Sequence, residues 1–394
     1  MSVTCITFPD MRIALLTSDN RESSKTYTSV VPCMGIAPEA LLQGFSSLPD
    51  VEINVISCLQ QPVPVPEQHV GNIHYHALHV PKAGWLRTGY QGCIRGVRRK
   101  VSELQPDLVH GQGTERDCAI SAVLSGFPNV ITIHGNMRAI ARVNRARPFS
   151  FLWLAARLER FILPRTAGVV CPTHYTFDAV RQLTPKAWVL PNAVDQSFFK
   201  VVVAPDPAGP PIGLCVGTIC HHKNQNDFIR ALDWLAKERP FRIVFLGQRE
   251  DDAYGNEFMR LIKDRPWCEY AGYANREQLK SWLTAATFLA HPTREDNCPM
   301  VVLEAMAAGV AVMASSIGGI PDLITDCETG LFGNPQHPES FAAGVLRLLD
   351  DRNFAQNLTI NARAQALQRF HPDIIARRHV EIYREVLARV PPSA

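Results

Sequence analysis

The sequence lacks a membrane-spanning segment, a signal peptide and the cysteine pattern of a zinc site. No run of about 18 apolar residues occurs, so no segment is expected to span a bilayer. Residues 1–10 have neither a basic start nor an apolar core, and no signal peptide is expected. The 11 cysteines are scattered without a Cys-x-x-Cys pair. We therefore expect reduced thiols in a cytoplasmic protein, without disulfides or zinc.

Three binding motifs are also missing. The apolar run at 11–16 is typical of the first strand of a doubly wound sheet, but no Gly-x-Gly-x-x-Gly follows it, which argues against a nicotinamide-dependent dehydrogenase. No Asp-x-Asp pair occurs, so the usual carboxylate site for a phosphate-bridging metal ion is absent and no metal is expected. With a pI of about 8.3 and no recognised nucleic-acid-binding motif, no nucleic-acid partner is expected.

What is present is a chain of two ordinary domains. Its 394 residues are 46% hydrophobic and 20% charged, which is typical of globular α/β proteins. Residues 1–200 carry 20 Lys and Arg against 14 Asp and Glu, and the remainder carries 20 against 23. A Pro-rich stretch at 201–211 reads as a semi-rigid linker. The expected division is a first domain at 1–200, the linker, a second domain at 212–372, and a terminal helix and tail at 373–394.

The most informative stretch runs from residue 291 to residue 322. An apolar run at 288–290 predicts a buried strand, and a polar loop leads from it to a helix at 300–308 that Gly309 ends. The N-terminus of such a helix offers N–H groups and a positive dipole end to an anion. Glu304 could accept hydrogen bonds from vicinal hydroxyls, and Asp296 could approach the same ligand from the loop. A capped amphipathic helix with no ligand remains the alternative.

The residues from Asp296 to Glu304 resemble the acidic-x7-Glu signature of the retaining glycosyltransferases of family four, also called glycosyl transferases group one. The family usually has Glu where this chain has Asp296, and Glu295 is a possible substitute. Gly318, Gly319 and the residues that follow them also match. The resemblance implies an α/β protein of the GT-B fold. Two Rossmann-like doubly wound parallel-sheet domains would face each other across a cleft, and the C-terminal helix would cross back to the first domain.

The resemblance also implies an activity. The chain would move a hexosyl group from a UDP-, GDP- or ADP-sugar to a hydroxyl acceptor, with retention at the anomeric carbon and without a metal. The acceptor could be a glycan, a lipid-linked compound or a small molecule, as in cell-surface polysaccharide or glycolipid synthesis. Two alternatives stay open. One is a sugar-nucleotide epimerase or sugar phosphorylase of the same fold, and the other is a non-catalytic protein that binds nucleotide sugars.

In the second domain the resemblance assigns a donor site. Gly217 and Lys223 keep the spacing of the family's Gly-Arg-x4-Lys clamp on the diphosphate, and Thr218 stands where the family has Arg. Lys223 would hold the diphosphate, Glu304 would bind the ribose and Asp296 the transferred sugar. The other donor-binding positions that the resemblance implies are Gly272, Tyr273, Glu295, Asn297, Cys298, Pro299, Met300 and Val301.

In the first domain the resemblance singles out three positions. An apolar strand is expected at 130–135, and His134 ends it at the carboxyl edge of the expected sheet, where open α/β folds bind ligands. A single histidine there is often structural, but the sequence around it resembles the family's donor-contacting histidine, which lies near the reacting centre. Gly35 matches one residue of a glycine pair near the donor phosphates, and a simple turn is the alternative. His110 resembles a second, weaker family position.

Residues 138–165 contain seven arginines against one acid, Glu159, interleaved with aromatic and aliphatic side chains. Such a mixture can mark a membrane surface or a site for a lipid-phosphate acceptor. An ordinary amphipathic helix with a solvated face explains it equally simply. The expected location is the cytoplasm, with peripheral association at the inner face of the membrane as the alternative.

Overall fold

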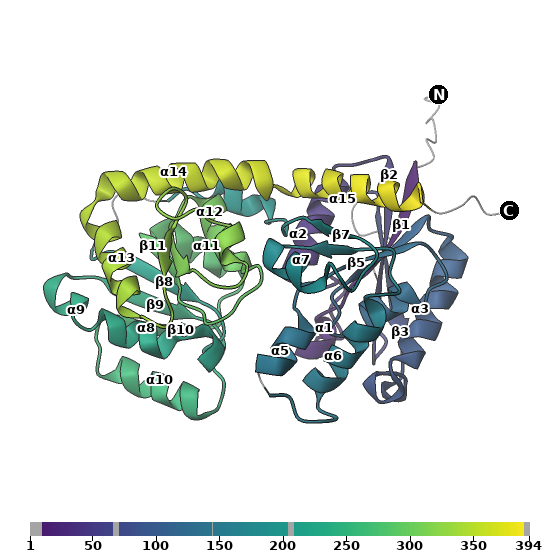
Figure 1. Ribbon diagram of the computed structural model, residues 1–394, viewed down its shortest axis with the longest axis horizontal. Helices are drawn as coiled ribbons and strands as arrows, with labels where there is room; N and C mark the ends of the chain where they lie inside the picture. Colours follow the sequence, from purple (N-terminus) through teal and green to yellow (C-terminus); the bar gives the residue numbers. More distant parts are fainter. Residues whose placement is uncertain (1–9, 66–70, 144, 204–208, 390–394) are drawn as a thin grey trace. The chain divides into compact units, whose positions relative to one another are not determined.

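The computed structural model describes residues 10–65, 71–143, 145–203 and 209–389 (Figure 1). The chain divides into two compact units. The first comprises Met1–Ala193 with Pro372–Ala394, and the second comprises Val194–His371. Each unit is described by itself below.

The first unit is built on a parallel sheet of seven strands in the order β3-β2-β1-β4-β5-β6-β7. Most of its strands are nearly continuous apolar runs, as expected where helices cover both faces of a sheet. The strands are β1 (Met11–Leu16), β2 (Val51–Leu59), β3 (Ile73–His79), β4 (Leu108–Gln112), β5 (Asn129–Thr132), β6 (Val169–Cys171) and β7 (Ala187–Val189).

Helices alternate with these strands along the chain, and short 3₁₀ turns lie at Lys82–Gly84 and Leu86–Thr88. The helices are α1 (Arg21–Ser24), α2 (Ile36–Ser46), α3 (Gln91–Leu104), α4 (Asp117–Val123), α5 (Met137–Val143), α6 (Phe151–Ile162), α7 (His174–Val180) and α15 (Pro372–Leu387).

The last helix, α15, belongs to the first unit although the whole second unit precedes it in the chain. It packs against α2 (Figure 1), and the two approach so closely that a Cβ on Gly44 would lie 2.1 Å from the carbonyl oxygen of Pro372. Ile375 and Tyr383 are fully buried in the core of this unit. The expected return of the C-terminal helix to the first domain is confirmed.

The second unit repeats the same plan with six parallel strands in the order β10-β9-β8-β11-β12-β13. In both sheets the order reverses beside the unit's first strand, at β1/β4 and at β8/β11, and such a reversal is where open α/β sheets bind ligands. The strands are β8 (Ile212–Val216), β9 (Arg242–Leu246), β10 (Cys268–Gly272), β11 (Phe288–His291), β12 (Ala311–Ser315) and β13 (Leu331–Gly333). The predicted Rossmann-like pair is thus confirmed.

The helices of the second unit cover both faces of this sheet, and 3₁₀ turns lie at Gln196–Lys200, His221–Lys223 and Ile320–Asp322. The helices are α8 (Gln225–Leu232), α9 (Leu235–Glu238), α10 (Ala253–Lys263), α11 (Arg276–Ala285), α12 (Met300–Ala308), α13 (Glu339–Asp350) and α14 (Arg352–Arg369). None of the helices in the described parts of the chain combines the length and apolar character needed to cross a bilayer.

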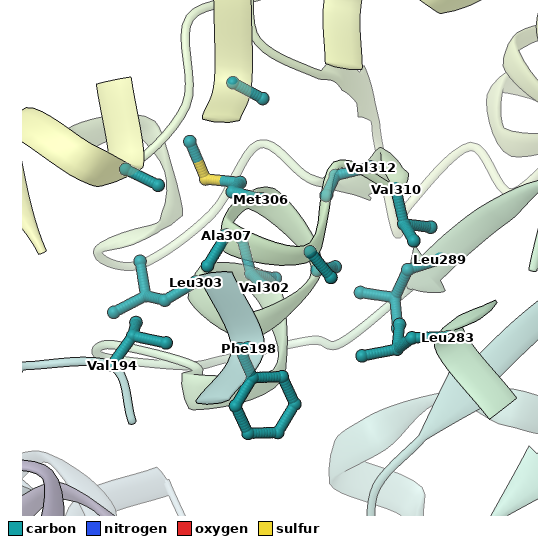
Figure 2. Packing of buried hydrophobic residues seen from close by; sticks show 14 of the residues in the cluster. Val194, Phe198, Leu283, Leu289, Val302, Leu303, Met306, Ala307, Val310 and Val312 are labelled. Atoms are coloured by element: carbon teal, nitrogen blue, oxygen red, sulfur yellow. The ribbon is translucent and has the colours of Figure 1, made fainter. Parts of the chain in front are cut away.

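The centre of the second unit is α12, whose predicted bounds the structure reproduces. It is apolar on every side and is packed all round, as a helix of that kind must be. Figure 2 shows Leu303 beside Val194, while Leu289 and Val312 lie on the other side of the helix, and Phe198 belongs to the same core cluster. Because α12 is held from all sides, its N-terminus is a rigid element.

The division into units falls before the expected linker. Residues 194–200 lie with the second unit, because Phe198 and Phe199 are buried in its core and Arg363 donates hydrogen bonds to the carbonyl oxygens of Phe199 and Val201. Of the expected linker at 201–211, residues 204–208 lie outside the described residues.

Some elements differ from expectation. The sequence predicts a single helix at 226–237, but the structure has two, α8 and α9, separated at Asp233 and Trp234. The strand expected to run through His134 ends at Thr132, which leaves His134 on the loop that follows β5. Strand β3 and the long helix α14 were not expected from the pattern.

Candidate functional site

Two loops of the second unit meet at the point where the strand order reverses. One follows β8 and carries Lys223, and the other follows β11 and carries Asp296. The two strands are hydrogen-bonded neighbours, with Ala290 opposite Cys215, so the loops at their carboxyl ends emerge side by side. The residues are 73 positions apart in the sequence, yet Lys223 Nζ lies 2.5 Å from Asp296 Oδ2.

A histidine completes this cluster. His291, the last residue of β11, places its Nε2 2.9 Å from the same Oδ2 of Asp296. Its side chain is almost fully buried, whereas those of Lys223 and Asp296 keep 23% and 16% of their surface exposed. A ligand can therefore reach the lysine and the carboxylate, while the histidine supports them from below.

The charges of the cluster are mutually adjusted. Burial acts to raise the pKa of Asp296, but Lys223 and the hydrogen bond from His291 outweigh it and hold that pKa well below its usual value. Burial lowers the pKa of His291, and Asp296 offsets this only in part. At neutral pH, Asp296 is therefore an anion, and a neutral His291 donates its Nε2 proton to it.

The backbone of the Asp296 loop is fastened by a glycine turn. Gly319 donates its N–H to the carbonyl oxygen of Asp296 at 2.9 Å. Gly318 has a φ of +61°, and a Cβ at this position would lie 2.0 Å from the same oxygen. Only glycine fits so close to the loop in that conformation. These two glycines, singled out with the family resemblance, thus hold Asp296 in place.

Arg294 is not available for a ligand in this arrangement. Its Nε donates to Asn224 Oδ1 at 3.0 Å, and its Nη2 pairs with Asp227 at 2.5 Å. Its N–H donates to the carbonyl oxygen of His222. Arg294 therefore ties the two loops together.

The N-terminus of α12 begins directly after the Asp296 loop. Pro299 is the N-cap residue, and its carbonyl oxygen accepts from the N–H of Val302. The N–H groups of Met300 and Val301 belong to the first turn, where a helix supplies no partner. The helix end is thus a source of positive potential beside a loop that already carries Lys223.

Glu304 lies one turn further into α12 and is almost fully buried. Burial raises its pKa, and the neighbouring guanidinium of Arg276, with which it forms an ion pair, offsets this in part. Arg276 also lies over the ring of Phe198, with 4.5 Å between Cζ and the ring centroid. Among the described residues, the Nη2 of Arg276 has no hydrogen-bond partner. No motif singles out Arg276, because it starts a different helix, α11.

The remaining donor-site positions lie around these two centres. The aliphatic stem of Lys223 passes Gly217, and a Cβ there would lie 3.8 Å from it. Thr218 is exposed, and its carbonyl oxygen accepts from Gln225. Gly272 ends β10, and Tyr273 beside it is 68% exposed. Three half-buried residues of the Asp296 loop complete the set: Glu295, Asn297 and Cys298.

In the first unit, His134 is held by a side chain that the sequence did not single out. Its Nε2 lies 2.8 Å from Gln112 Oε1, at the end of the neighbouring strand β4. Burial lowers the pKa of His134 to about 4. The ring is therefore neutral at pH 7, and Gln112 Oε1, which can only accept, selects the tautomer with the proton on Nε2.

Behind Gln112 lies a buried histidine network. His110 Nδ1 is 2.6 Å from Tyr383 Oη on α15, and its Nε2 is 2.8 Å from Thr132 Oγ1. His379, also on α15, contacts the carbonyl oxygen of Ile375 through Nδ1. His110 therefore has a structural position, since no part of it reaches solvent.

Gly35 is the N-cap of α2 in an extended conformation, with φ −65° and ψ 154°. That conformation is open to other residues, so the backbone alone does not require glycine there. A Cβ would meet only the ring of Pro38, at 3.5 Å.

The first unit also contains a group of three potential metal ligands that the sequence did not reveal. One atom each from Cys58, Cys93 and Asp117 lies within 4.8 Å of the others, and all three residues are buried. They come from β2, α3 and α4, so their spacing in the sequence does not predict that they lie together.

Comparison with known families covers most of the chain. Residues 41–198 match the family described as Glycosyltransferase Family 4, and residues 200–365 match the family described as Glycosyl transferases group 1. The two matches follow each other along the chain.

Individual glycosyltransferases and a solved structure are also similar to this chain. An uncharacterized glycosyltransferase of Methanocaldococcus jannaschii is 29% identical over 43% of this chain, which spans 44% of that relative's length. The 2-deoxystreptamine glucosyltransferase of Streptomyces kanamyceticus is 25% identical to this chain. The match covers 81% of this chain and 86% of the length of that enzyme. The crystal structure of Anabaena HepE in complex with UDP-glucose superposes with a TM-score of 0.69 at 17% identity, covering 95% of this chain and all of that one. The GT-B fold expected from the sequence is confirmed.

Proposed function

We propose that this chain, which belongs to family four of the glycosyltransferases, transfers a hexosyl group from a nucleotide-diphosphate sugar to a hydroxyl acceptor with retention of configuration. The observation that carries the proposal is the pairing of Lys223 with Asp296 beside the N-terminus of α12. A cation, a carboxylate and a set of backbone N–H groups there converge on the carboxyl edge of one sheet.

The diphosphate is the part of the donor that this site suits best. Negative charge grows on the departing diphosphate in an oxocarbenium-like transition state, so cations placed there stabilise the transition state more than the ground state. Lys223 supplies one full charge, and the N–H groups of Met300 and Val301 supply the partial charge of the helix end. Thr218 adds no charge, and the guanidinium of Arg294 is committed to Asp227. The role of Lys223 is correspondingly large.

Asp296 is placed to accept hydrogen bonds from the hydroxyls of the transferred sugar. As an anion held by Lys223 and His291, it offers oxygen lone pairs and no proton. Glu304 is proposed to bind the ribose hydroxyls. Its neighbour Arg276 is proposed to orient the carboxylate, and the Nη2 of Arg276, which has no partner among the described residues, is proposed to donate to the ligand or to a water molecule.

In the first unit, His134 is proposed to contact the transferred sugar near the reacting carbon. Because its pKa is lowered to about 4, it acts as a neutral hydrogen-bonding group and not as a cation. Gly35 is proposed to lie near the donor phosphates. The transfer is proposed to need no metal, since Lys223 and the helix end supply the positive charge for which other enzymes use a divalent ion.

The donor is proposed to be a UDP-, GDP- or ADP-sugar. A protein of the same fold, Anabaena HepE, is known in complex with UDP-glucose, which supports a nucleotide sugar without fixing the base. Tyr273, exposed at the end of β10, is proposed to lie near the base together with the backbone of Gly272. The acceptor would belong to polysaccharide or glycolipid synthesis in the cytoplasm, and residues 138–165 are the candidate contact with a membrane surface.

The first test is a thermal-shift panel of UDP-, GDP- and ADP-sugars, because a ligand that binds only the native state raises the melting temperature. The nucleotide sugar with the largest shift is then incubated with the protein, and the products are identified. A new glycoside, or slow release of nucleotide with retained configuration of the sugar, supports the proposal. A sugar phosphate or an epimerised nucleotide sugar would instead identify a phosphorylase or an epimerase. The absence of any shift and any product would contradict donor binding altogether.

A further inference from the structure

A cavity of the first unit has a volume of about 660 Å³, which is the size of a small-molecule site. Its lining comes from segments that follow β1, β2, β3 and β4, so it opens at the carboxyl edge of the sheet, where this fold binds ligands. Nothing in the donor site described above uses these residues.

The charges around this cavity are strongly unequal. Four cations line it, namely Lys25, Lys82, Arg87 and Arg116, against one carboxylate, Glu22. All four cationic side chains are exposed, so each can turn toward a ligand.

The single carboxylate is already satisfied within the unit. Glu22 accepts hydrogen bonds from the N–H of Gln60 at 2.9 Å, from Tyr27 Oη at 3.1 Å and from Lys25 Nζ at 3.4 Å. In the described parts of the chain no ion pair joins Lys82, Arg87 or Arg116 to a carboxylate. Arg116 is within electrostatic range of the buried carboxyl groups of Glu115 and Asp117, but it forms no close ion pair with either among the described residues. Three positive charges at the cavity are therefore not bound in ion pairs there.

One wall of the cavity is aromatic and rigid. Trp85 and Tyr90 are almost fully buried and meet edge to face, with 6.3 Å between their ring centroids. Trp85 Nε1 donates to the carbonyl oxygen of Val80 at 2.9 Å, which fixes the indole. Phe151, at the start of α6, also lines the cavity and is 44% exposed. The buried pair gives this side of the cavity a fixed apolar lining, against which the hydrophobic face of a sugar or cyclitol ring can pack.

We infer that this cavity binds the acceptor, and that the acceptor is a polyol or sugar that carries a phosphate group. The inference rests on the proposed transferase function and adds the chemical class of its second substrate. Three unpaired cations, two of them arginines, match a phosphate monoester, which carries −1.5 to −2 charges at pH 7, better than a carboxylate with a single charge. The guanidinium groups can bind phosphate oxygens in pairs, and the aromatic wall can support the ring that bears the reacting hydroxyl.

The same chemistry could come from a soluble sugar phosphate or from the headgroup of a phospholipid. Phe149, which is 80% exposed, and Phe151 stand at the start of α6 beside the cavity lining. The test therefore has an arm for each source.

Binding is measured first, on the full chain and independently of turnover. Thermal shift and calorimetry compare glucose, glucuronate, glucose 6-phosphate and inositol 1-phosphate, which differ in charge but share a similar ring. We expect measurable binding of the phosphates, weaker binding of glucuronate and none of glucose. Sedimentation with vesicles of phosphatidylcholine, with and without phosphatidylinositol, tests the lipid source. Binding of soluble phosphates or of phosphatidylinositol vesicles supports the inference, and equal behaviour of charged and neutral compounds overturns it.

Variants then locate the site. Arg87→Gln and Arg116→Gln should each weaken binding of the phosphate roughly ten-fold, as expected for loss of one charge-assisted hydrogen bond, and the double variant should weaken it further. Arg98→Gln is the matched control, because Arg98 is an exposed arginine of α3 outside the cavity and should leave binding unchanged. If Arg87→Gln, Arg116→Gln and their double variant all bind the phosphate as tightly as the wild type does, the cavity is not the binding site.

Transfer is measured last, with the nucleotide sugar that the thermal-shift panel selects. A phosphorylated acceptor should accelerate nucleotide release, and Arg116→Gln should raise its KM with a smaller effect on kcat. If the wild type transfers to neutral and phosphorylated acceptors with the same KM, the inference fails while the transferase function stands. If the donor neither binds nor reacts, the proposed function fails, and the binding arms still decide whether this cavity holds a phosphate.

Discussion

Lys223 and Asp296 form an ion pair across two loops, with 2.5 Å between the ammonium nitrogen and the carboxylate oxygen. His291 supports the pair from within the unit, so the protein's own contacts position both charges. Such preorganisation lowers the cost of arranging charges during the reaction. It also means that Lys223 has two tasks, since it balances the charge of Asp296 and is proposed to receive the diphosphate.

The two tasks can be separated by comparing single and double variants. Lys223→Ala should reduce turnover about 100-fold or more, which is typical for the loss of one group that stabilises charge in the transition state. It should also lower the free energy of unfolding by about 1–2 kcal/mol, because Asp296 loses its main partner while remaining partly solvated. The double variant Lys223→Ala with Asp296→Asn should recover most of this stability and none of the turnover. Steady-state kinetics and urea unfolding provide the two readings.

An unchanged turnover in Lys223→Ala would remove this lysine from the mechanism. A double variant that regains activity would show instead that the lysine acts only by neutralising Asp296. Lys237→Ala is a suitable control, since Lys237 lies on α9, away from both loops.

Glu304 offers a second test. Glu304→Gln keeps the shape of the side chain but removes the charge that strengthens its hydrogen bonds to the proposed ribose hydroxyls. We expect the dissociation constant of the nucleotide to rise about ten-fold, which corresponds to about 1.4 kcal/mol. Calorimetry with the nucleotide alone measures this without turnover. Glu339→Gln, at the exposed start of α13, should have no effect, and an unchanged affinity in Glu304→Gln would argue against a ribose contact.

Acid should destabilise the first unit through its buried histidines. Burial lowers the pKa of His379 to about 4, with a smaller contribution from His134, and the backbone hydrogen bond to Ile375 opposes this. The unfolded chain takes up the proton near pH 6.5, so stability is present above that pH and is lost as the pH falls from about 6.5 toward 4. Between pH 7 and pH 5 this one group should cost about 2 kcal/mol.

The histidine prediction is checked with His379→Gln, which does not titrate in this range. Its free energy of unfolding, measured in urea at pH 7 and pH 5, should fall by about 2 kcal/mol less than that of the wild type. Equal losses in the two proteins would show that His379 is protonated in the native state as readily as in the unfolded chain.

Removal of divalent ions should leave the reaction intact. The proposed charge stabilisation comes from Lys223 and the N-terminus of α12, and neither binds a metal. We expect the turnover to be the same with and without EDTA. Full loss in the chelator, restored by added magnesium or manganese, would refute the proposed metal independence.

Much of the second unit was predictable because its local signals agree. The bounds of α12 follow from Pro299 before it and Gly309 after it, and the structure reproduces them. The meeting of the Lys223 and Asp296 loops follows from the strand order of a doubly wound sheet, which brings the ends of β8 and β11 together. Here a local pattern and a general rule of topology were enough.

Contacts made through tertiary packing were not predictable. Arg276 pairs with Glu304 although it belongs to another helix, and Gln112 holds His134 from a neighbouring strand. Neither residue stands in a motif, and glutamine or arginine at such positions has no periodic signal. His291 could have been found, because it ends a buried strand at the carboxyl edge of its sheet, the same kind of position that drew attention to His134 in the first unit. The cavity beside Trp85 could not be predicted from the sequence either, because its lining comes from segments spread over more than half of the first unit.

The placement of α15 has a consequence for how the protein is made. A ribosome produces the chain from its N-terminus, so the second unit is synthesised in full before α15 emerges. Until then the apolar face of α2 lacks Ile375 and Tyr383, and His110 lacks the phenol that contacts its ring. The unit whose synthesis begins first is therefore the last to reach its native core. A nascent chain stalled before residue 372 would hold an unfinished first unit beside a completed second one.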